Sequence, residues 1–97
     1  ARGYGVIREY VGHGIGTEMH QEPMVPNYGP AGKGLVLANG LTIAIEPMLT
    51  LGGWQTKLGG DKWTVSTEDR SISAHWEHSI VVLDDGPEVL TSLTGRP

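Results

Sequence analysis

Four ionisable side chains of this sequence occupy positions where simple exposure to water is not the only explanation. His13 lies between two glycines, and His20 follows it shortly afterwards. Glu46 ends one apolar run, and Glu77 comes just before another. A carboxylate at the end of an apolar strand is costly to desolvate unless a cation, hydrogen-bond donors or protonation compensate it. For either glutamate alone, a side chain that reaches water is the simpler interpretation. Two such glutamates together with two histidines, one of them flanked by glycines, favour a clustered carboxylate and imidazole site.

A cluster of this kind suits a divalent metal ion bound through oxygen and nitrogen. The chain has no cysteine, so Mn, Fe, Co or Zn fits it better than a metal that prefers thiolates. Sites with two metal ions hold them about 3.5–4 Å apart and share carboxylates between them. Two divalent ions carry four positive charges, whereas Glu46 and Glu77 supply two negative ones. We therefore expect the chain to hold only part of a two-metal site.

The segment 75–78 (HWEH) contains one more candidate donor. Alternation along a strand puts His75 and Glu77 on one face and His78 on the other. His75 is thus a candidate ligand, although an exposed histidine or one that supports a ligand is the more common case. The sequence has no His-Glu-x-x-His pair and no Gly-x-Ser-x-Gly turn. Lys33 lies between glycines but lacks the rest of a phosphate-binding loop, so it is interpreted as a solvated lysine.

Short strands must position these residues, because 15 glycines and 6 prolines interrupt the 97-residue chain and no capped stretch has a helical period. A sharp bend is expected at Gly12 and Gly14. Residues 21–34 and 52–60 are expected to be exposed connections. Strands are predicted over 4–11, 41–45 (with both faces covered), 63–67, 72–83 and 88–91. The sequence therefore predicts a β-rich half-fold.

Composition limits the classes of partner and the cellular compartment that are expected for the chain. The formal net charge of −4 and the sequence pI near 5.4 argue against a nucleic-acid partner. No apolar run approaches the ~20 residues that span a bilayer, and the first residues lack the apolar stretch of a signal peptide, so no membrane partner is expected. The lack of cysteine is compatible with a reducing compartment, and a cytoplasmic location is expected.

Four segments that together span almost the whole chain resemble type I methionine aminopeptidases. They are 3–23 (GYGVIREYVGHGIGTEMHQEP), 45–48 (IEPM), 62–69 (KWTVSTED) and 73–82 (SAHWEHSIVV). The resemblance implies a pita-bread fold of the α/β (α+β) class. Residues 1–97 would form the C-terminal part of its catalytic domain, as a β-rich antiparallel sheet. The upstream half, with two aspartate ligands and a further active-site histidine, would be absent from this chain and would be its partner.

The resemblance also implies a role for each matched polar residue. His13, Glu46 and Glu77 would bind two divalent metal ions (Co, Mn, Fe or Zn). Glu46 would in addition act as the general base, and His20 would be a catalytic residue that contacts the scissile peptide. The complete enzyme would remove the initiator methionine from nascent polypeptides whose second residue is small. The chain alone is expected to be inactive.

Two further residues would belong to the substrate pocket in this resemblance. Trp63 lies where the family places a tryptophan near the methionine side chain, and Met19 occupies a position that is often aromatic in relatives. Much of the pocket would come from the upstream half.

Related classes of the same fold are separated by spacing and motif. Type II enzymes insert a long segment between the second histidine and the Glu-Pro motif; the separation of 26 positions here, 46 minus 20, leaves no room for it. Prolidases and proline-specific aminopeptidases usually place the last glutamate in an Arg-x-Glu-Asp context, unlike residues 75–78. Non-catalytic peptide-binding relatives lose metal ligands that this chain retains. The proline-specific and non-catalytic classes stay as alternatives, and a peptide-binding module would bind methionine-initiated peptides without metal.

Overall fold

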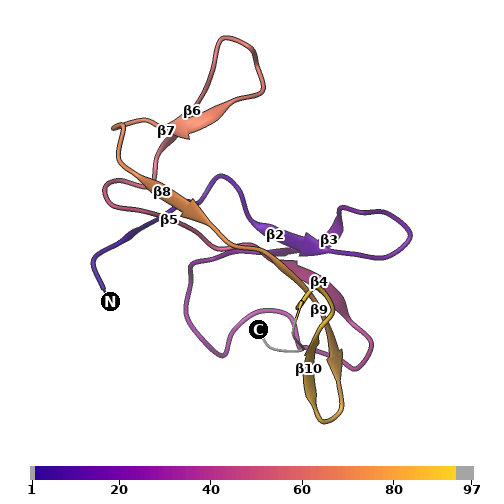
Figure 1. Ribbon diagram of the computed structural model, residues 1–97. Coiled ribbons are helices and arrows are strands. Elements are labelled where there is room, and N and C mark those ends of the chain that lie inside the picture. Colours follow the sequence, from indigo (N-terminus) through magenta and orange to yellow (C-terminus); the bar gives the residue numbers. More distant parts are fainter. Residues whose placement is uncertain (1, 94–97) are drawn as a thin grey trace.

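The computed structural model describes residues 2–93, which form ten short strands and no helix (Figure 1). Within that range, therefore, no helix is long and apolar enough to cross a membrane. The strands are β1 (Gly5–Val6), β2 (Gly12–Gly14), β3 (Gln21–Val25), β4 (Thr42–Ile45), β5 (Met48–Thr50), β6 (Thr56–Leu58), β7 (Val65–Thr67), β8 (Ser73–His75), β9 (His78–Leu83) and β10 (Gly86–Val89).

The strands form three antiparallel sheets. In two of them, strands of one sheet continue along the chain directly into strands of the other. The largest has the order β10-β9-β4-β2-β3, a second has the order β1-β5-β8, and β6 pairs with β7. The chain passes from β4 to β5 through Glu46-Pro47 and from β8 to β9 through Trp76-Glu77, and these strands also pair with each other. Residues 46–47 and 76–77 therefore lie side by side at a seam between the two sheets, near the centre of Figure 1.

The apolar core of the described residues is small and lies on β4 and beside β1. Ile43 and Ala44 are 4% and 0% exposed, and Ile7 is also buried. Because consecutive residues of a strand point to opposite faces, β4 is covered on both faces, as predicted. Elsewhere large apolar side chains reach the surface, such as Val36 at 81% and Ile72 at 73% exposure. Such exposure is more than an isolated small domain normally carries.

Several predicted elements are confirmed and others are wrong. The strands predicted over 41–45, 63–67 and 88–91 correspond to β4, β7 and β10, within the usual uncertainty of strand ends. The strand predicted over 4–11 is wrong beyond Val6, because only β1 is paired there. The bend predicted at Gly12 and Gly14 follows them instead, over residues 16–20 between β2 and β3. Both glycines belong to β2, where a Cβ would collide with the carbonyl oxygens of Ala44 and Glu22. They allow close strand packing rather than a turn.

Three further corrections come from long-range pairing. Residues 72–83 are two strands rather than one, because the backbone N–H of Trp76 donates to Pro47 O (3.1 Å) where the chain leaves one sheet for the other. The connection predicted over 21–34 contains β3, which tolerates Pro23 because it is the edge strand of its sheet. The connection predicted over 52–60 contains β6, which pairs with β7.

The turn between β6 and β7 is organised by Asp61. One of its carboxylate oxygens accepts hydrogen bonds from the backbone N–H of Trp63 (3.0 Å) and of Thr64 (2.8 Å). The other accepts from the Thr64 hydroxyl at 2.5 Å. These bonds lower the pKa of Asp61 to about 2, and the bond from the Thr64 side chain has the largest effect. The turn is thereby tied to an ionised carboxylate two residues before Trp63.

We expect this turn to loosen in acid. Because the pKa of Asp61 is depressed in the folded state, its contribution is present above the ordinary pKa of 3.8 and is lost as the pH falls toward 2. An NMR titration should show the Asp61 carboxyl and the Thr64 amide moving together with a midpoint near 2. The Thr64 transition should vanish in Asp61→Asn. A midpoint near 3.8 would contradict the hydrogen bonding described here.

Candidate metal centre

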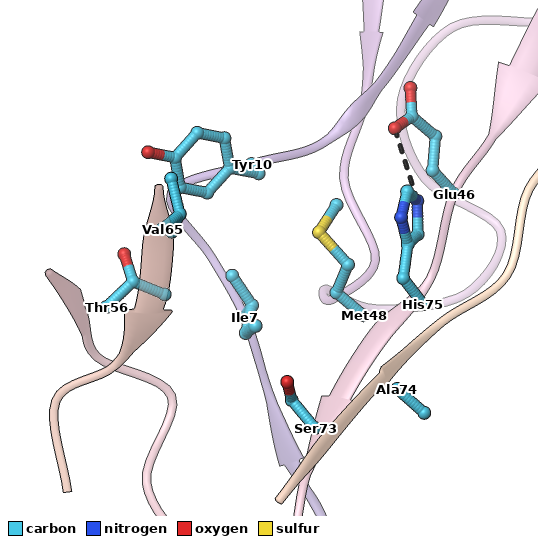
Figure 2. A pocket seen from close by; sticks show the side chains of 9 residues that line it. All are labelled: Ile7, Tyr10, Glu46, Met48, Thr56, Val65, Ser73, Ala74 and His75. Carbon is cyan, nitrogen blue, oxygen red and sulfur yellow. Dashed lines mark ion pairs between the residues drawn. The ribbon is translucent and has the colours of Figure 1, made fainter. Parts of the chain in front are cut away.

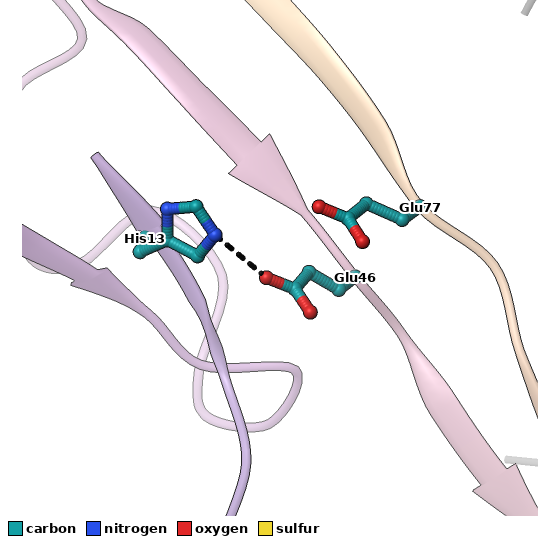
Figure 3. Close-up of side chains that lie close together, drawn as sticks. All are labelled: His13, Glu46 and Glu77. Carbon is teal, nitrogen blue, oxygen red and sulfur yellow. Dashed lines mark ion pairs between the residues drawn. The ribbon is translucent and has the colours of Figure 1, made fainter. Parts of the chain in front are cut away.

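Three potential metal ligands meet at the seam: His13, Glu46 and Glu77, here called the donor triad (Figure 3). His13 is the central residue of β2, Glu46 directly follows β4, and Glu77 lies between β8 and β9. Strand β4 pairs with β2 on one side and with β9 on the other. Sheet pairing therefore brings together residues that are far apart in the sequence, and the ligand atoms of the triad all lie within 4.8 Å of one another.

The hydrogen bonding of His13 leaves one ring nitrogen directed at Glu46. Its Nδ1 lies 3.0 Å from Gly14 O, and since a carbonyl oxygen only accepts, Nδ1 carries the proton and donates. In the neutral imidazole Nε2 is then an acceptor, and it lies 3.0 Å from Oε2 of Glu46. Two acceptors at this distance repel unless a proton or a cation lies between them. This arrangement is the one in which a histidine binds a metal ion.

The surroundings of Glu46 hold it in place and partly exclude water. The side chains of His13 and Glu46 are only 15% and 14% exposed, whereas Glu77 is exposed. The side-chain amide of Asn27 donates to the backbone oxygen of Glu46 at 3.1 Å. Asn27 was not among the residues predicted from the sequence, because an amide in a Pro- and Gly-rich loop has no local signature of this contact.

A divalent ion fits the donor triad. One imidazole nitrogen and two carboxylates form a nitrogen and oxygen ligand set suited to Mn, Fe, Co or Zn. Two atoms that each lie about 2.1 Å from one ion are at most about 4.2 Å apart, so small side-chain movements would close the observed spacing. A cation would also offset the repulsion between the two carboxylates. The triad supplies two negative charges, fewer than a pair of divalent ions requires.

His20 and His75 lie next to the triad without belonging to it. The ring centroids of His13 and His20 are 4.2 Å apart, with a tilt of 47° between the planes. Nε2 of His75 lies 3.5 Å from Oε1 of Glu46, the carboxylate oxygen that does not face His13. The alternation that predicted a shared face for His75 and Glu77 does not apply, because β8 ends at His75. The role of His75 as a ligand stays a prediction.

A mostly apolar cavity of about 310 Å³ extends from Glu46 and His75 toward the β6–β7 hairpin (Figure 2). Met19 and Trp63 do not line this cavity and are 74% and 85% exposed. Their assignment to a methionine pocket stays a prediction that the described residues do not test. The cavity is lined by Ile7, Tyr10, Glu46, Met48, Thr56, Val65, Ser73, Ala74 and His75.

Known sequences resemble the chain over nearly its whole length. It is 54% identical over 89 residues to a methionine aminopeptidase of Clostridium acetobutylicum. The matched segment is 92% of this chain and 36% of that protein. It is 54% identical over 90 residues to methionine aminopeptidase 1 of Mycobacterium tuberculosis, covering 93% and 34% of the two. The chain thus spans about a third of the length of these relatives.

Solved structures show the same fold. A methionine aminopeptidase from Thermotoga maritima superposes with a TM-score of 0.89 at 50% identity, covering 93% of this chain and 36% of that one. The corresponding enzyme of Rickettsia prowazekii gives 0.88 at 46% identity, with 93% and 37% covered. The predicted pita-bread fold is therefore confirmed. The part of the fold described for this chain is rich in strands, as predicted.

The family assignment rests on sequence and agrees with the donor triad. Residues 1–84 match metallopeptidase family M24, and a metallopeptidase acts on peptides with the help of divalent metal ions. The cluster of His13, Glu46 and Glu77 is where this chain gathers donors for such an ion. The chain belongs to metallopeptidase family M24.

Proposed function

We propose that this chain is the C-terminal part, residues 1–97, of a methionine aminopeptidase that removes the initiator methionine from nascent polypeptides. The observation that carries the proposal is the donor triad, in a chain about half identical to proteins named methionine aminopeptidase. Nascent chains emerge in the cytoplasm, so we place the activity there. Peptides are the substrates, and neither nucleic acid nor membrane is a partner in this proposal.

An upstream half of the same enzyme is the proposed partner of the chain. The triad alone lacks the negative charge that two divalent ions need. The apolar core is small, and further protein would cover the exposed apolar side chains described above. The length of the relatives, about three times the matched segment, supplies such a half. The complete site would then hold two divalent ions (Co, Mn, Fe or Zn), with His13, Glu46 and Glu77 among their ligands.

Each proposed catalytic residue has a defined task in peptide hydrolysis. When bound, the metal ions supply Lewis acidity and an activated water. Glu46 accepts a proton from the water that attacks the carbonyl carbon of the first peptide bond, and the departing amine takes up a proton as the C–N bond breaks. His20, beside His13, stabilises the charge that develops on the carbonyl oxygen. Trp63 and Met19 contribute to the pocket for the methionine side chain.

The test is methionine release from a peptide that begins Met-Ala, with Co(II) or Mn(II) and a chelator control. The purified chain, of verified mass, would be assayed alone and after addition of the upstream half of the Thermotoga maritima relative. We expect no release by the chain alone and chelator-sensitive release by the combination. A peptide with proline in second position serves as the substrate control.

The other outcomes separate the alternatives. Release by the chain alone would contradict an incomplete site. Preferential cleavage before proline would indicate a prolidase-like or proline-specific enzyme. Saturable, metal-independent binding of methionine-initiated peptides without release would indicate a non-catalytic relative.

A further inference from the structure

We propose that His75 is a positioning residue for Glu46. The two carboxylate oxygens of Glu46 face different imidazoles: Oε2 lies 3.0 Å from Nε2 of His13, and Oε1 lies 3.5 Å from Nε2 of His75. Figure 2 shows the second contact at one end of the cavity. An N–H donor that faces Oε1 limits rotation of the carboxylate about its last bond, because rotation would turn Oε1 away from the donor. His75 thereby fixes which oxygen of Glu46 faces His13.

The backbone around this contact is fixed independently of the side chains of His75 and Glu46. His75 pairs with Met48 in the β5–β8 register. The N–H of Trp76 donates to Pro47 O at 3.1 Å, which ties the residues directly after His75 and Glu46 to each other. Asn27 holds the backbone oxygen of Glu46 from another segment. The imidazole and the carboxylate therefore project from neighbouring strands in a set register.

The chemistry of the contact requires a proton on Nε2 of His75. An ionised carboxylate only accepts hydrogen bonds, so Nε2–H must be the donor. At 3.5 Å the contact is longer than a formed hydrogen bond, as is common for active-site contacts before substrate and ions are in place. A neutral donor of similar reach should serve equally well. His75 is 48% exposed, so water would partly replace a deleted imidazole.

The test compares His75→Ala, which removes the donor, with His75→Gln, which restores a neutral N–H donor. Mn(II) affinity is measured by titration calorimetry, and methionine release is measured on the same preparations of the chain combined with the upstream half of the Thermotoga maritima relative. In His75→Ala both the affinity and the turnover should fall by about 10-fold, the low end of the range for groups that orient metal ligands. In His75→Gln both should return close to the wild-type values. Circular dichroism confirms folding, and His75→Met, of similar size without a donor, replaces His75→Ala if the latter does not fold.

The outcomes distinguish this inference from the proposed function on which it rests. Wild-type affinity and turnover in His75→Ala would overturn the positioning role. Equal losses in His75→Gln and His75→Ala would also overturn it, since a neutral N–H donor at this position would then not be enough. If the wild-type protein binds Mn(II) but releases no methionine, the proposed function fails, while the three affinities still decide the role of His75.

Discussion

Replacing Glu46 with Gln should abolish methionine release. An amide cannot take the proton of the attacking water, and loss of a general base alone costs about 10²–10⁴-fold in rate. The amide also presents either an uncharged oxygen or N–H donors at the position 3.0 Å from Nε2 of His13, where the carboxylate charge would attract a cation. Because the side chain is only 14% exposed, little water can take over either task.

This experiment needs a control that separates base catalysis from metal binding and folding. Glu88→Gln makes the same chemical change on the exposed face of β10, outside the donor triad, and should leave the rate unchanged. Bound metal is measured by elemental analysis, and the assay is repeated with excess Mn(II). Most of the wild-type activity in Glu46→Gln would rule out the general-base role. Activity that returns with excess Mn(II) would limit Glu46 to metal binding.

The sequence could predict features of the site that depend on local pattern. The apolar run before Glu46 is β4 with both faces covered, and Glu77 does lie directly before β9. The sequence indicates these positions because Glu46 closes one apolar run and Glu77 comes just before another. Residue types alone left the clustering of the donors as a hypothesis, and the family resemblance supplied their roles. Pairing of β4 with both β2 and β9 is what brings the donors together.

Features that depend on contacts between distant segments could not be predicted in this way. The composition of the segment around His13 is equally compatible with a bend and with a closely packed strand, and only the approach of Ala44 and Glu22 shows which is formed. The break after His75 depends on a hydrogen bond to Pro47 in another strand. Alternation within residues 72–83 contains no sign of that bond.

His13 and His20 offer the sharpest test of how the site divides its work. The rings are 4.2 Å apart, yet only His13 belongs to the donor triad and directs a ring nitrogen at Glu46. We expect His13→Ala to lose bound metal and, with it, turnover. His20→Ala should retain metal but lower kcat by about 10²–10³-fold, the usual cost of removing one group that stabilises an oxyanion.

The two variants are matched, because each removes one imidazole from the same neighbourhood. Metal content is measured by elemental analysis and turnover with the Met-Ala peptide under excess Mn(II). Loss of metal from His20→Ala would make His20 a ligand and would contradict the division proposed here. Full metal content in His13→Ala would show that Glu46, Glu77 and the upstream ligands hold the ions without it. In that case the 3.0 Å contact between His13 and Glu46 would be an ion pair of the folded chain rather than part of a metal site.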